Sequence, residues 1–407
     1  MLILYKGVVK LKEYILRIQR LQERLRQSQL DGCMITQNVD LYYFTGSMQT
    51  GYLFVPSEGE AVFFVRRSVV RAQEESAITV EALGSFRSFG KRLAEVFGAL
   101  FQQAAGSPKL KFAAEFDVLP VQQLLKLQNV LPNVEWADGS TIVRELRMIK
   151  SASEIAYIKE AARVIDLAFE HSLSILKPGV TELELMASIE QFIRLNGHIG
   201  LMRMRGYNQE VITGMVGAGE AAATPSYFDG PAGGRGLSAA VPQSASRRPI
   251  QANEPILLDV GCCIDGYVID QTRTVVMGNL PDDLVHAYDT SERILRSVEE
   301  MLKPGTVCER LYMHSLLMAH EAGLSDHYMG FGDDQVKFLG HGIGLEIDEL
   351  PVLAKGFNYP LQPGMVIAIE PKFTFPQRGV VGIENSYAIT DTGFEKLTIT
   401  REGLIRA

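Results

Sequence analysis

Cysteine is scarce in this chain, with 4 residues among 407. A disulfide scaffold in a chain of this length would need more cysteines, and two of the four are adjacent and awkward to bridge. The four positions are Cys33, Cys262, Cys263 and Cys308. We therefore expect buried free thiols and a reducing, cytoplasmic location.

Long apolar runs and an excess of basic charge are also missing. A run of the roughly 18 apolar residues that a membrane helix needs is nowhere present, and lysines interrupt the N-terminal MLILYKGVVKLKEY, which has no signal-peptide cleavage site. The 40 basic and 48 acidic residues give a formal net charge of −8. This charge argues against a nucleic-acid groove or an anionic membrane surface as the main partner and favours a small or cationic ligand.

The length predicts two or three domains, at about 100–200 residues per domain. Apolar residues at three- and four-residue steps, from Ile15 to Leu25, predict an amphipathic helix over about 9–30. The β-rich runs DGCMITQ, YLFVP and AVFFVR alternate with helical stretches such as 90–105, which is typical of an α/β unit. Ser151 and Glu154 form a capping box that starts a long helix reaching about Leu176. We therefore expect domains at 1–145 and 146–407.

The second domain shows signs of an internal repeat. LKPGVTELEL (176–185) and LKPGTVCERL (302–311) each combine a helix end, a Pro-Gly turn and a Thr-x-x-Glu capping box for the next helix. EPILLDVG (254–261) and GMVIAIEP (364–371) each place an acid after an apolar β-rich run. Two related halves are thus expected to supply one carboxylate-bearing strand each.

Turn signals predict how these carboxylates face one another. Asp265-Gly266 is a strong two-residue hairpin signal, and a loop at these residues places Asp259 opposite Thr272. Asp270, two residues from Thr272, then shares a face with Asp259, at the diagonal separation of about 7–8 Å. In the second half, Glu370 and Glu384 flank the turn-like FPQRG and share a face if the loop has an odd number of residues.

Four buried carboxylates need compensating positive charge, because each like-charged contact near 4 Å costs about 4 kcal/mol at an effective dielectric of 20. Arg273 and Lys372 are nearby basic candidates, but Arg273 is three positions from Asp270 and so faces away. Two divalent cations would cancel the four charges. His341, between glycines in FLGHGIGLEI, offers an imidazole, and oxygen ligands with one histidine suit Mn, Co, Fe or Zn.

These motifs resemble a known family. DVGCCIDGYVIDQTRT, GHGIGLE, IEPKF and GIEN are similar, in order and spacing, to the signature of the pita-bread metallopeptidases of family M24, which include methionine aminopeptidase, aminopeptidase P, prolidase and creatinase. LQERLRQSQLDGCMIT and NVDLYYFTG resemble the creatinase-type N-terminal domain. The resemblance implies an α/β (α+β) protein, with a creatinase-like N-terminal domain followed by a pita-bread domain with a pseudo-twofold repeat. It also implies pairing in a homodimer.

The resemblance implies roles for individual residues. Five positions match the family's metal ligands, with Asp270 and Glu384 bridging two metal ions: Asp259, Asp270, His341, Glu370 and Glu384. It further implies that metal-activated water attacks the scissile carbonyl while Glu370 handles the proton, in agreement with the chemistry of paired metals.

The chain departs from the family pattern at two catalytic positions. Ser226 and Asp348 stand where the resemblance leads us to expect histidines that donate hydrogen bonds to the substrate carbonyl or the oxyanion. Losing one such donor typically costs about 2.7–4 kcal/mol in the barrier. Asp348 could be protonated, or could bind a substrate ammonium group.

A third possibility is that the Gly- and Ser-rich segment 214–248 replaces the missing donors. This segment is expected to be either a surface loop or an active-site flap. Its candidate residues are Glu220, Tyr227 and Arg235.

Three functions remain open at this point. The first is hydrolysis of a C–N bond near a free amino terminus, in a proline-containing di- or oligopeptide. The second is a catalytically silent metal- or peptide-binding protein. The third is a creatinase-like hydrolase of a small amidine or amide, for which bound metal would be unexpected.

Overall fold

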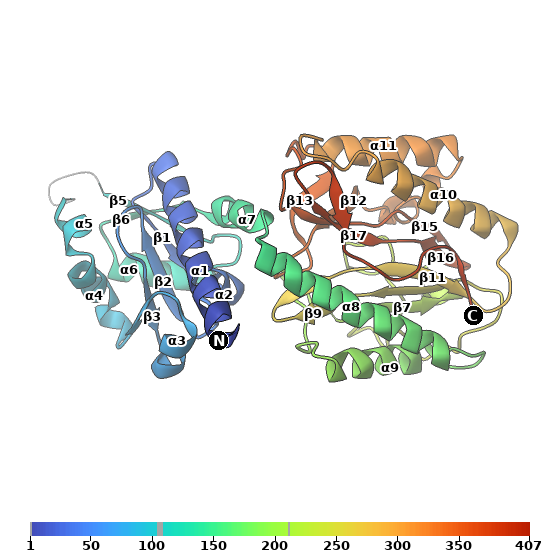
Figure 1. Cartoon of the computed structure of the whole chain (residues 1–407), viewed down its shortest axis with the longest axis horizontal. Coiled ribbons are helices and arrows are strands. Elements are labelled where there is room, and N and C mark those ends of the chain that lie inside the picture. Colours follow the sequence, from blue (N-terminus) through green and yellow to red (C-terminus); the bar gives the residue numbers. More distant parts are fainter. Residues whose placement is uncertain (1, 104–108, 211) are drawn as a thin grey trace. The chain divides into compact units, whose positions relative to one another are not determined.

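A computed structural model describes residues 2–103, 109–210 and 212–407 of the chain (Figure 1). It divides into two compact units, Met1–Leu146 and Arg147–Ala407. The fold is of the mixed α/β class that the sequence predicts.

The first unit is built on a six-stranded mixed sheet of order β4-β3-β2-β1-β5-β6. Its strands are β1 (Gly32–Ile35), β2 (Gly51–Pro56), β3 (Val62–Val65), β4 (Thr79–Ala82), β5 (Leu110–Ala114) and β6 (Val134–Asp138). Its helices are α1 (Leu2–Gln27), α2 (Asn38–Thr45), α3 (Val69–Glu75), α4 (Phe89–Val96), α5 (Gly98–Gln103), α6 (Val121–Val130) and α7 (Ser140–Met148), the last of which runs into the second unit. The helix expected over about 9–30 is α1, whereas the stretch expected over 90–105 is two helices, α4 and α5, with 104–105 outside the described residues.

Helices cover both faces of this sheet (Figure 1). Helix α1 contacts β1 and β2 on one face, while side chains of α4 and α6 pack with Met34, Phe54 and Phe112 on the other. This explains why β1 and β3 are buried along their whole length, as expected for strands covered on both faces.

The described residues of the second unit form two larger sheets and two hairpins. One sheet has the order β19-β11-β8-β7 and the other β13-β12-β14-β17-β18, while β9 pairs with β10 and β15 with β16. The strands are β7 (Gly214–Ala218), β8 (Ile256–Val260), β9 (Cys262–Ile264), β10 (Tyr267–Ile269), β11 (Thr272–Val276), β12 (Phe338–Gly342), β13 (Glu349–Ala354), β14 (Val366–Ile369), β15 (Lys372–Phe375), β16 (Gly379–Gly382), β17 (Asn385–Ile389), β18 (Phe394–Lys396) and β19 (Ile405–Arg406). The helices are α8 (Ala152–Ile175), α9 (Glu182–Leu195), α10 (Asp282–Glu299) and α11 (Cys308–Glu321).

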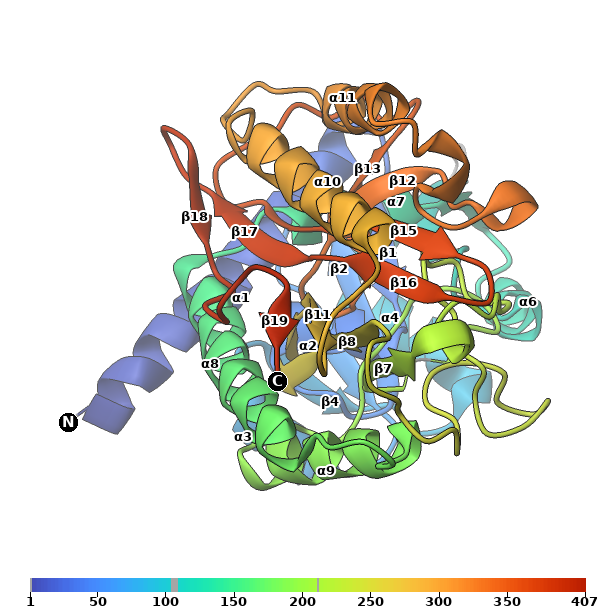
Figure 2. The same ribbon diagram turned by 90° about the vertical axis from the view of Figure 1, so that its right-hand side faces the viewer.

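Two helix pairs enclose these sheets. Helices α8 and α9 lie on one side of the strands, and α10 and α11 lie on the opposite side, in both ribbon views (Figures 1 and 2). Each pair precedes its own carboxylate-bearing strands in the chain. The arrangement agrees with two related halves.

The predicted helix starts are confirmed in the first half and wrong in the second. Ser151 with Glu154, and Thr181 with Glu184, form complete capping boxes at the starts of α8 and α9. Thr306 does not cap α11, which begins at Cys308. Its hydroxyl instead donates to the carbonyl of Met301 at 2.8 Å.

The first predicted hairpin is confirmed in detail. Tyr267 pairs with Ile264, and Thr272 pairs with Asp259. The loop residues Asp265 and Gly266 have φ values of 50° and 94°, as a type I′ turn requires. The turn therefore fixes the strand register that places Asp259 opposite Thr272.

Replacing Gly266 with alanine is expected to lower the free energy of unfolding by about 1–2 kcal/mol, since a Cβ is strained at positive φ. Urea unfolding followed by circular dichroism measures the loss. The matched control is Gly305→Ala, at a φ of 89° in a turn outside the site, which is expected to cost a similar amount. A loss at Gly266 below about 0.5 kcal/mol would contradict the turn assignment.

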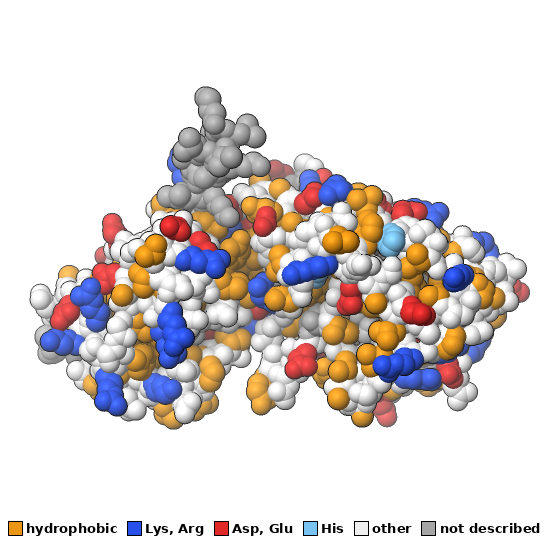
Figure 3. All heavy atoms as spheres, turned by 90° about the horizontal axis from the view of Figure 1, so that it is seen from below, with side chains coloured by type: hydrophobic (Ala, Val, Ile, Leu, Met, Phe, Trp, Pro, Cys, Tyr) orange, Lys and Arg blue, Asp and Glu red, His pale blue; other side chains and the backbone are white. Residues whose placement is uncertain are grey.

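All four cysteines are buried free thiols, as the sequence predicts. Within the described part of the chain, no helix combines the length and apolar character needed to cross a membrane. Figure 3 shows acidic and basic side chains of the described residues interspersed over one face of the molecule, without a gathering of one sign there.

Candidate metal centre

The two carboxylate-bearing hairpins meet at Thr272, the first residue of β11. Thr272 pairs with Asp259 of β8 on one side and forms a bridge with Glu384 on the other. The Glu384 amide donates to the Thr272 carbonyl at 3.1 Å, and the Thr272 hydroxyl donates to Glu384 Oε2 at 2.7 Å. This residue therefore connects carboxylates from the two halves.

The second hairpin places its carboxylates as predicted. Lys372 pairs with Gly382 and Phe375 with Gly379, which leaves a loop of residues 376–378. An odd loop puts Glu370 and Glu384, just outside the paired strands, on a common face.

His341 lies on β12, in the interior of the five-stranded sheet. A Cβ at Gly340 would lie 2.0 Å from the Ala368 carbonyl oxygen, so only glycine permits this close strand pairing. His341 Nδ1 lies 3.2 Å from the Gly342 carbonyl oxygen. Donation from Nδ1 to this carbonyl leaves Nε2 with a lone pair, as in a metal-binding histidine.

The five predicted ligands converge as two overlapping donor sets. Asp270, His341 and Glu384 form the first set, and Asp259, Glu370 and Glu384 form the second. The donor atoms of each set lie within 4.8 Å of one another. The shared residue, Glu384, is 1% exposed.

Lys372 lies inside the second set. Its Nζ donates to Glu370 Oε2 at 2.6 Å, to Asp259 Oδ2 at 2.9 Å and to Glu384 Oε2 at 3.2 Å. The side chain is 1% exposed. From the sequence, Lys372 was predicted only to be a nearby basic residue. Its spacing of two from Glu370, which along an extended chain means a common face, was the signal for this position.

The first donor set fits a divalent cation. Glu384 Oε1 is buried and has no hydrogen-bond partner among the described residues, and the Asp270 carboxylate accepts no hydrogen bond from them. A buried carboxylate oxygen without a partner, such as Glu384 Oε1, is costly, and a cation bound between Glu384 and Asp270 would satisfy it. Two carboxylates and an imidazole are donors that Mn, Co, Fe and Zn accept.

The second donor set fits a divalent cation poorly while Lys372 stays in place. An ammonium group already neutralises charge there and takes one oxygen of each of the three carboxylates. A divalent ion 4 Å from an ammonium group is repelled by about 8 kcal/mol at an effective dielectric of 20.

The pKa values reflect crowded acids in a buried site. Burial raises the pKa of Glu370 to about 7, although Lys372 opposes the shift. Burial and the charge of Glu384 raise the pKa of Asp270 well above its ordinary value. Burial alone would lower the pKa of His341, but Asp348 and Glu370 outweigh it and raise that pKa.

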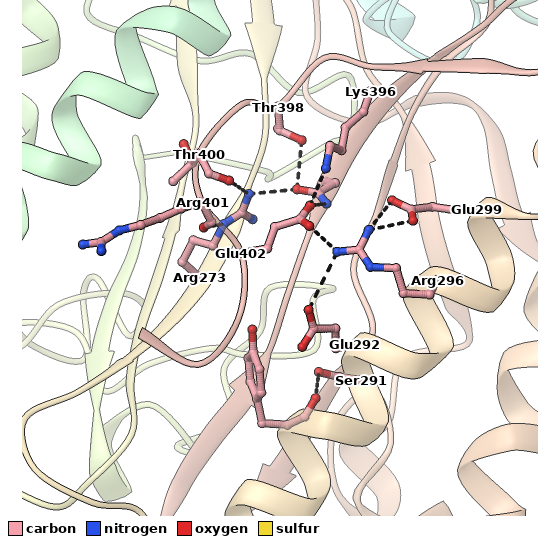
Figure 4. Close-up of polar contacts among 12 residues, drawn as sticks. Arg273, Ser291, Glu292, Arg296, Glu299, Lys396, Thr398, Thr400, Arg401 and Glu402 are labelled. Atoms are coloured by element: carbon pink, nitrogen blue, oxygen red, sulfur yellow. Dashed lines mark hydrogen bonds and ion pairs between the residues drawn. The ribbon is translucent and has the colours of Figure 1, made fainter. Parts of the chain in front are cut away.

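Arg273 supports the site from behind, as the alternation of strand faces predicts. Its guanidinium donates to the Glu384 carbonyl at 2.7 Å and to the Thr400 carbonyl at 2.8 Å. Figure 4 shows Arg273 beside Thr400 and Arg401, with Glu402 held by Arg296 and Lys396 nearby. Arg273 therefore fixes the backbone at Glu384 and leaves the carboxylates to Lys372.

The carboxylates open into a cavity. A space of about 100 Å³ is lined by Asp259, Asp270, His341 and Glu370, and a neighbouring cavity of about 990 Å³ is also lined by His341. Asp348 is exposed and lines both spaces.

Ser226 lines only the larger cavity. Its hydroxyl oxygen accepts a hydrogen bond from the Phe228 amide at 3.2 Å, within its own turn.

Segment 214–248 is part strand and part cavity wall. It begins with β7, and residues 222–233 line the larger cavity, while Gln243 and Ser244 line the smaller one. Glu220 and Arg235 form an exposed ion pair at 3.0 Å and line neither space. Tyr227 lines the larger cavity, where its hydroxyl accepts a hydrogen bond from Gln243.

Comparisons with known proteins cover nearly the whole chain. Residues 17–149 match the Creatinase/Prolidase N-terminal domain. An Xaa-Pro dipeptidase of Pyrococcus horikoshii is 26% identical over 391 residues, which cover 96% of this chain and 98% of the relative. An uncharacterized peptidase of Bacillus subtilis, YqhT, is 28% identical over 399 residues, with 96% of this chain and 99% of the relative covered.

Solved structures agree with these relatives. The prolidase from Pyrococcus horikoshii OT3 superposes with a TM-score of 0.78 at 25% identity and covers 96% of this chain and 99% of its own. An Xaa-Pro dipeptidase from Bacillus anthracis superposes with a TM-score of 0.80 at 26% identity, covering 97% and 100%. Residues 156–391 match metallopeptidase family M24, and the chain, a hydrolase that carries this family's catalytic domain behind a creatinase-type N-terminal domain, belongs to that family.

Proposed function

We propose that this protein is a metal-dependent peptidase that cleaves short peptides near a free amino terminus, with Xaa-Pro di- and oligopeptides as the substrate class. The observation that carries the proposal is the convergence of Asp270, His341 and Glu384, where Asp270 lines the cavity of about 100 Å³ and His341 lines both this cavity and the neighbouring one of about 990 Å³. Relatives described as Xaa-Pro dipeptidases support the substrate class.

Each part of the site has a role in this proposal. Asp270, His341 and Glu384 would hold a divalent ion, which would supply activation of water and polarisation of a carbonyl when bound. Glu370 lines the smaller cavity, with Oε1 3.6 Å from His341 Nε2, and accepts the proton of the attacking water. Arg273 keeps Glu384 in position through its carbonyl.

The acidic cavity wall suits the amino terminus of a peptide. The lining of the larger cavity includes more acidic than basic side chains. It contains one lysine, Lys337, and four aspartates, Asp229, Asp333, Asp334 and Asp348. A carboxylate attracts an ammonium group, so in this proposal Asp348, which borders both spaces, binds the substrate amine rather than stabilising an oxyanion. Ser226 stays a predicted catalytic position without a supporting contact.

Several finer points stay predictions. They are the identity of the metal among Mn, Co, Zn and Fe, the presence of two ions rather than one, the cytoplasmic location and the homodimer. The position of Lys372 bears directly on the number of ions.

Chelation is expected to abolish cleavage of an Xaa-Pro substrate, and adding back one of the four metals is expected to restore it, because the ligands alone cannot activate water. The measurement is release of the N-terminal amino acid from a panel of Xaa-Pro and Xaa-Ala dipeptides and tripeptides. Metal uptake without turnover on any of them would reject the enzyme in favour of the silent binder. Cleavage that survives complete metal removal would contradict the metal dependence.

A further inference from the structure

We infer that the ammonium group of Lys372 takes the place of one of two divalent ions, so that this peptidase works with a single ion bound by Asp270, His341 and Glu384. The inference rests on the proposed function and deepens it by fixing the composition of the centre.

The ammonium group occupies the donors of the second set. Its three hydrogen bonds, of 2.6–3.2 Å, go to the three carboxylates that form this set, Asp259, Glu370 and Glu384. A metal ion would have to bind the same carboxylates at about 2.0–2.2 Å. The ion and the ammonium group would then compete for one small volume.

The fold makes room for this lysine. Gly382 stands opposite Lys372 in the hairpin, and a Cβ at Gly382 would lie 2.6 Å from Lys372 Cγ. Glycine at this position thus accommodates the lysine stem, which is buried with the rest of the side chain. Three charged hydrogen bonds and a packed stem make the ammonium group a built-in part of the centre.

The first set remains short of positive charge. Asp270 accepts no hydrogen bond from the described residues, and Glu384 Oε1 is buried without a partner. With all four carboxylates ionised, the single positive charge of Lys372 leaves three of their negative charges uncompensated among the described residues. One divalent ion in the first set would reduce this excess to one, with His341 Nε2 completing its ligands.

The test is the number of Mn²⁺ ions per chain. The full-length protein is stripped with a chelator, reloaded with Mn²⁺ alone and measured by native mass spectrometry. We expect one ion in the wild type and two in Lys372→Ala, because removing the ammonium group frees the second set. The matched control, Lys159→Ala, removes a half-exposed lysine paired with Glu395 and is expected to keep one ion.

A second measurement does not depend on any variant. Electron paramagnetic resonance of the Mn²⁺-loaded wild type is expected to show the six-line spectrum of an isolated ion. A spin-coupled pair, or two ions per wild-type chain, would overturn the inference, as would a folded Lys372→Ala that still binds one ion. If Lys372→Ala does not fold, the wild-type spectrum decides.

The outcomes separate this inference from the proposed function. Two ions with peptide cleavage would reject the single-ion centre and leave the peptidase. One ion without cleavage of any peptide would support the single-ion centre and reject the peptidase. Binding of no ion at all would overturn both.

Discussion

Replacing Glu370 with glutamine is expected to lower kcat by about 10²–10⁴-fold on any Xaa-Pro peptide that the wild type cleaves. Glutamine keeps the size of the side chain and one oxygen, but it cannot accept a proton from water at neutral pH. Burial raises the pKa of Glu370 to about 7, so this side chain can exchange protons near that pH. The measurement is steady-state kinetics at saturating metal.

The fold of this variant is expected to remain intact. Lys372 keeps Asp259 and Glu384 as acidic partners, so circular dichroism and the Mn²⁺ content should match the wild type. The control is Glu395→Gln, which removes a half-exposed carboxylate paired with Lys159. Wild-type kcat in a metal-loaded Glu370→Gln would contradict the proposed role.

A loss of about 3–5 kcal/mol in the free energy of unfolding is expected for Glu349→Gln, because breaking a buried ion pair leaves uncompensated charge. Glu349 accepts a hydrogen bond from Lys150 Nζ at 3.1 Å and pairs with Arg147, which also bonds Glu346 at 2.8 Å. Arg147, Lys150 and Glu349 are each at most 6% exposed as side chains. Urea unfolding at pH 7 measures the difference.

The difference in the free energy of unfolding between the wild type and Glu349→Gln should become smaller at acidic pH. Burial alone would raise the pKa of Glu349, but Arg147 and Lys150 outweigh it and lower that pKa from 4.5 to about 2. A lowered pKa stabilises the fold above the unfolded-state value near 4.5, and this contribution is lost as the pH falls towards 2. The gap between wild type and Glu349→Gln should therefore be constant from pH 7 to about 5 and then narrow. A gap that widens in this window would contradict the assignment, and Glu395→Gln, the exposed control, should stay within about 0.5 kcal/mol of the wild type.

Local rules predicted the parts of the site that depend on turns. The Asp-Gly loop specified the register of β9 and β10, and through it the pairing of Asp259 with Thr272. The odd loop after Phe375 placed Glu370 and Glu384 in the same way. Turn type and strand alternation depend on residues that are close together in the chain, so both can be predicted from the sequence.

Contacts between distant segments were harder to predict. The Thr306 capping box failed because Val307 bridges to Pro360 and the Thr306 hydroxyl turns back to Met301, and both contacts depend on packing that a local motif does not encode. The contacts of Lys372 with the carboxylates were not predicted, for a related reason. Its position depends on Gly382 across the hairpin, and a glycine opposite a lysine is informative only once the pairing is known.

The bridge between Thr272 and Glu384 links the two halves of the second unit at the candidate metal centre. Asp270 comes from one half, and His341 and Glu384 from the other, so an ion that binds all three joins segments of the chain that the unfolded state holds apart. By linkage, ion binding and folding then favour each other to the same extent. The availability of divalent ions would set not only how fast the protein works but how long it survives.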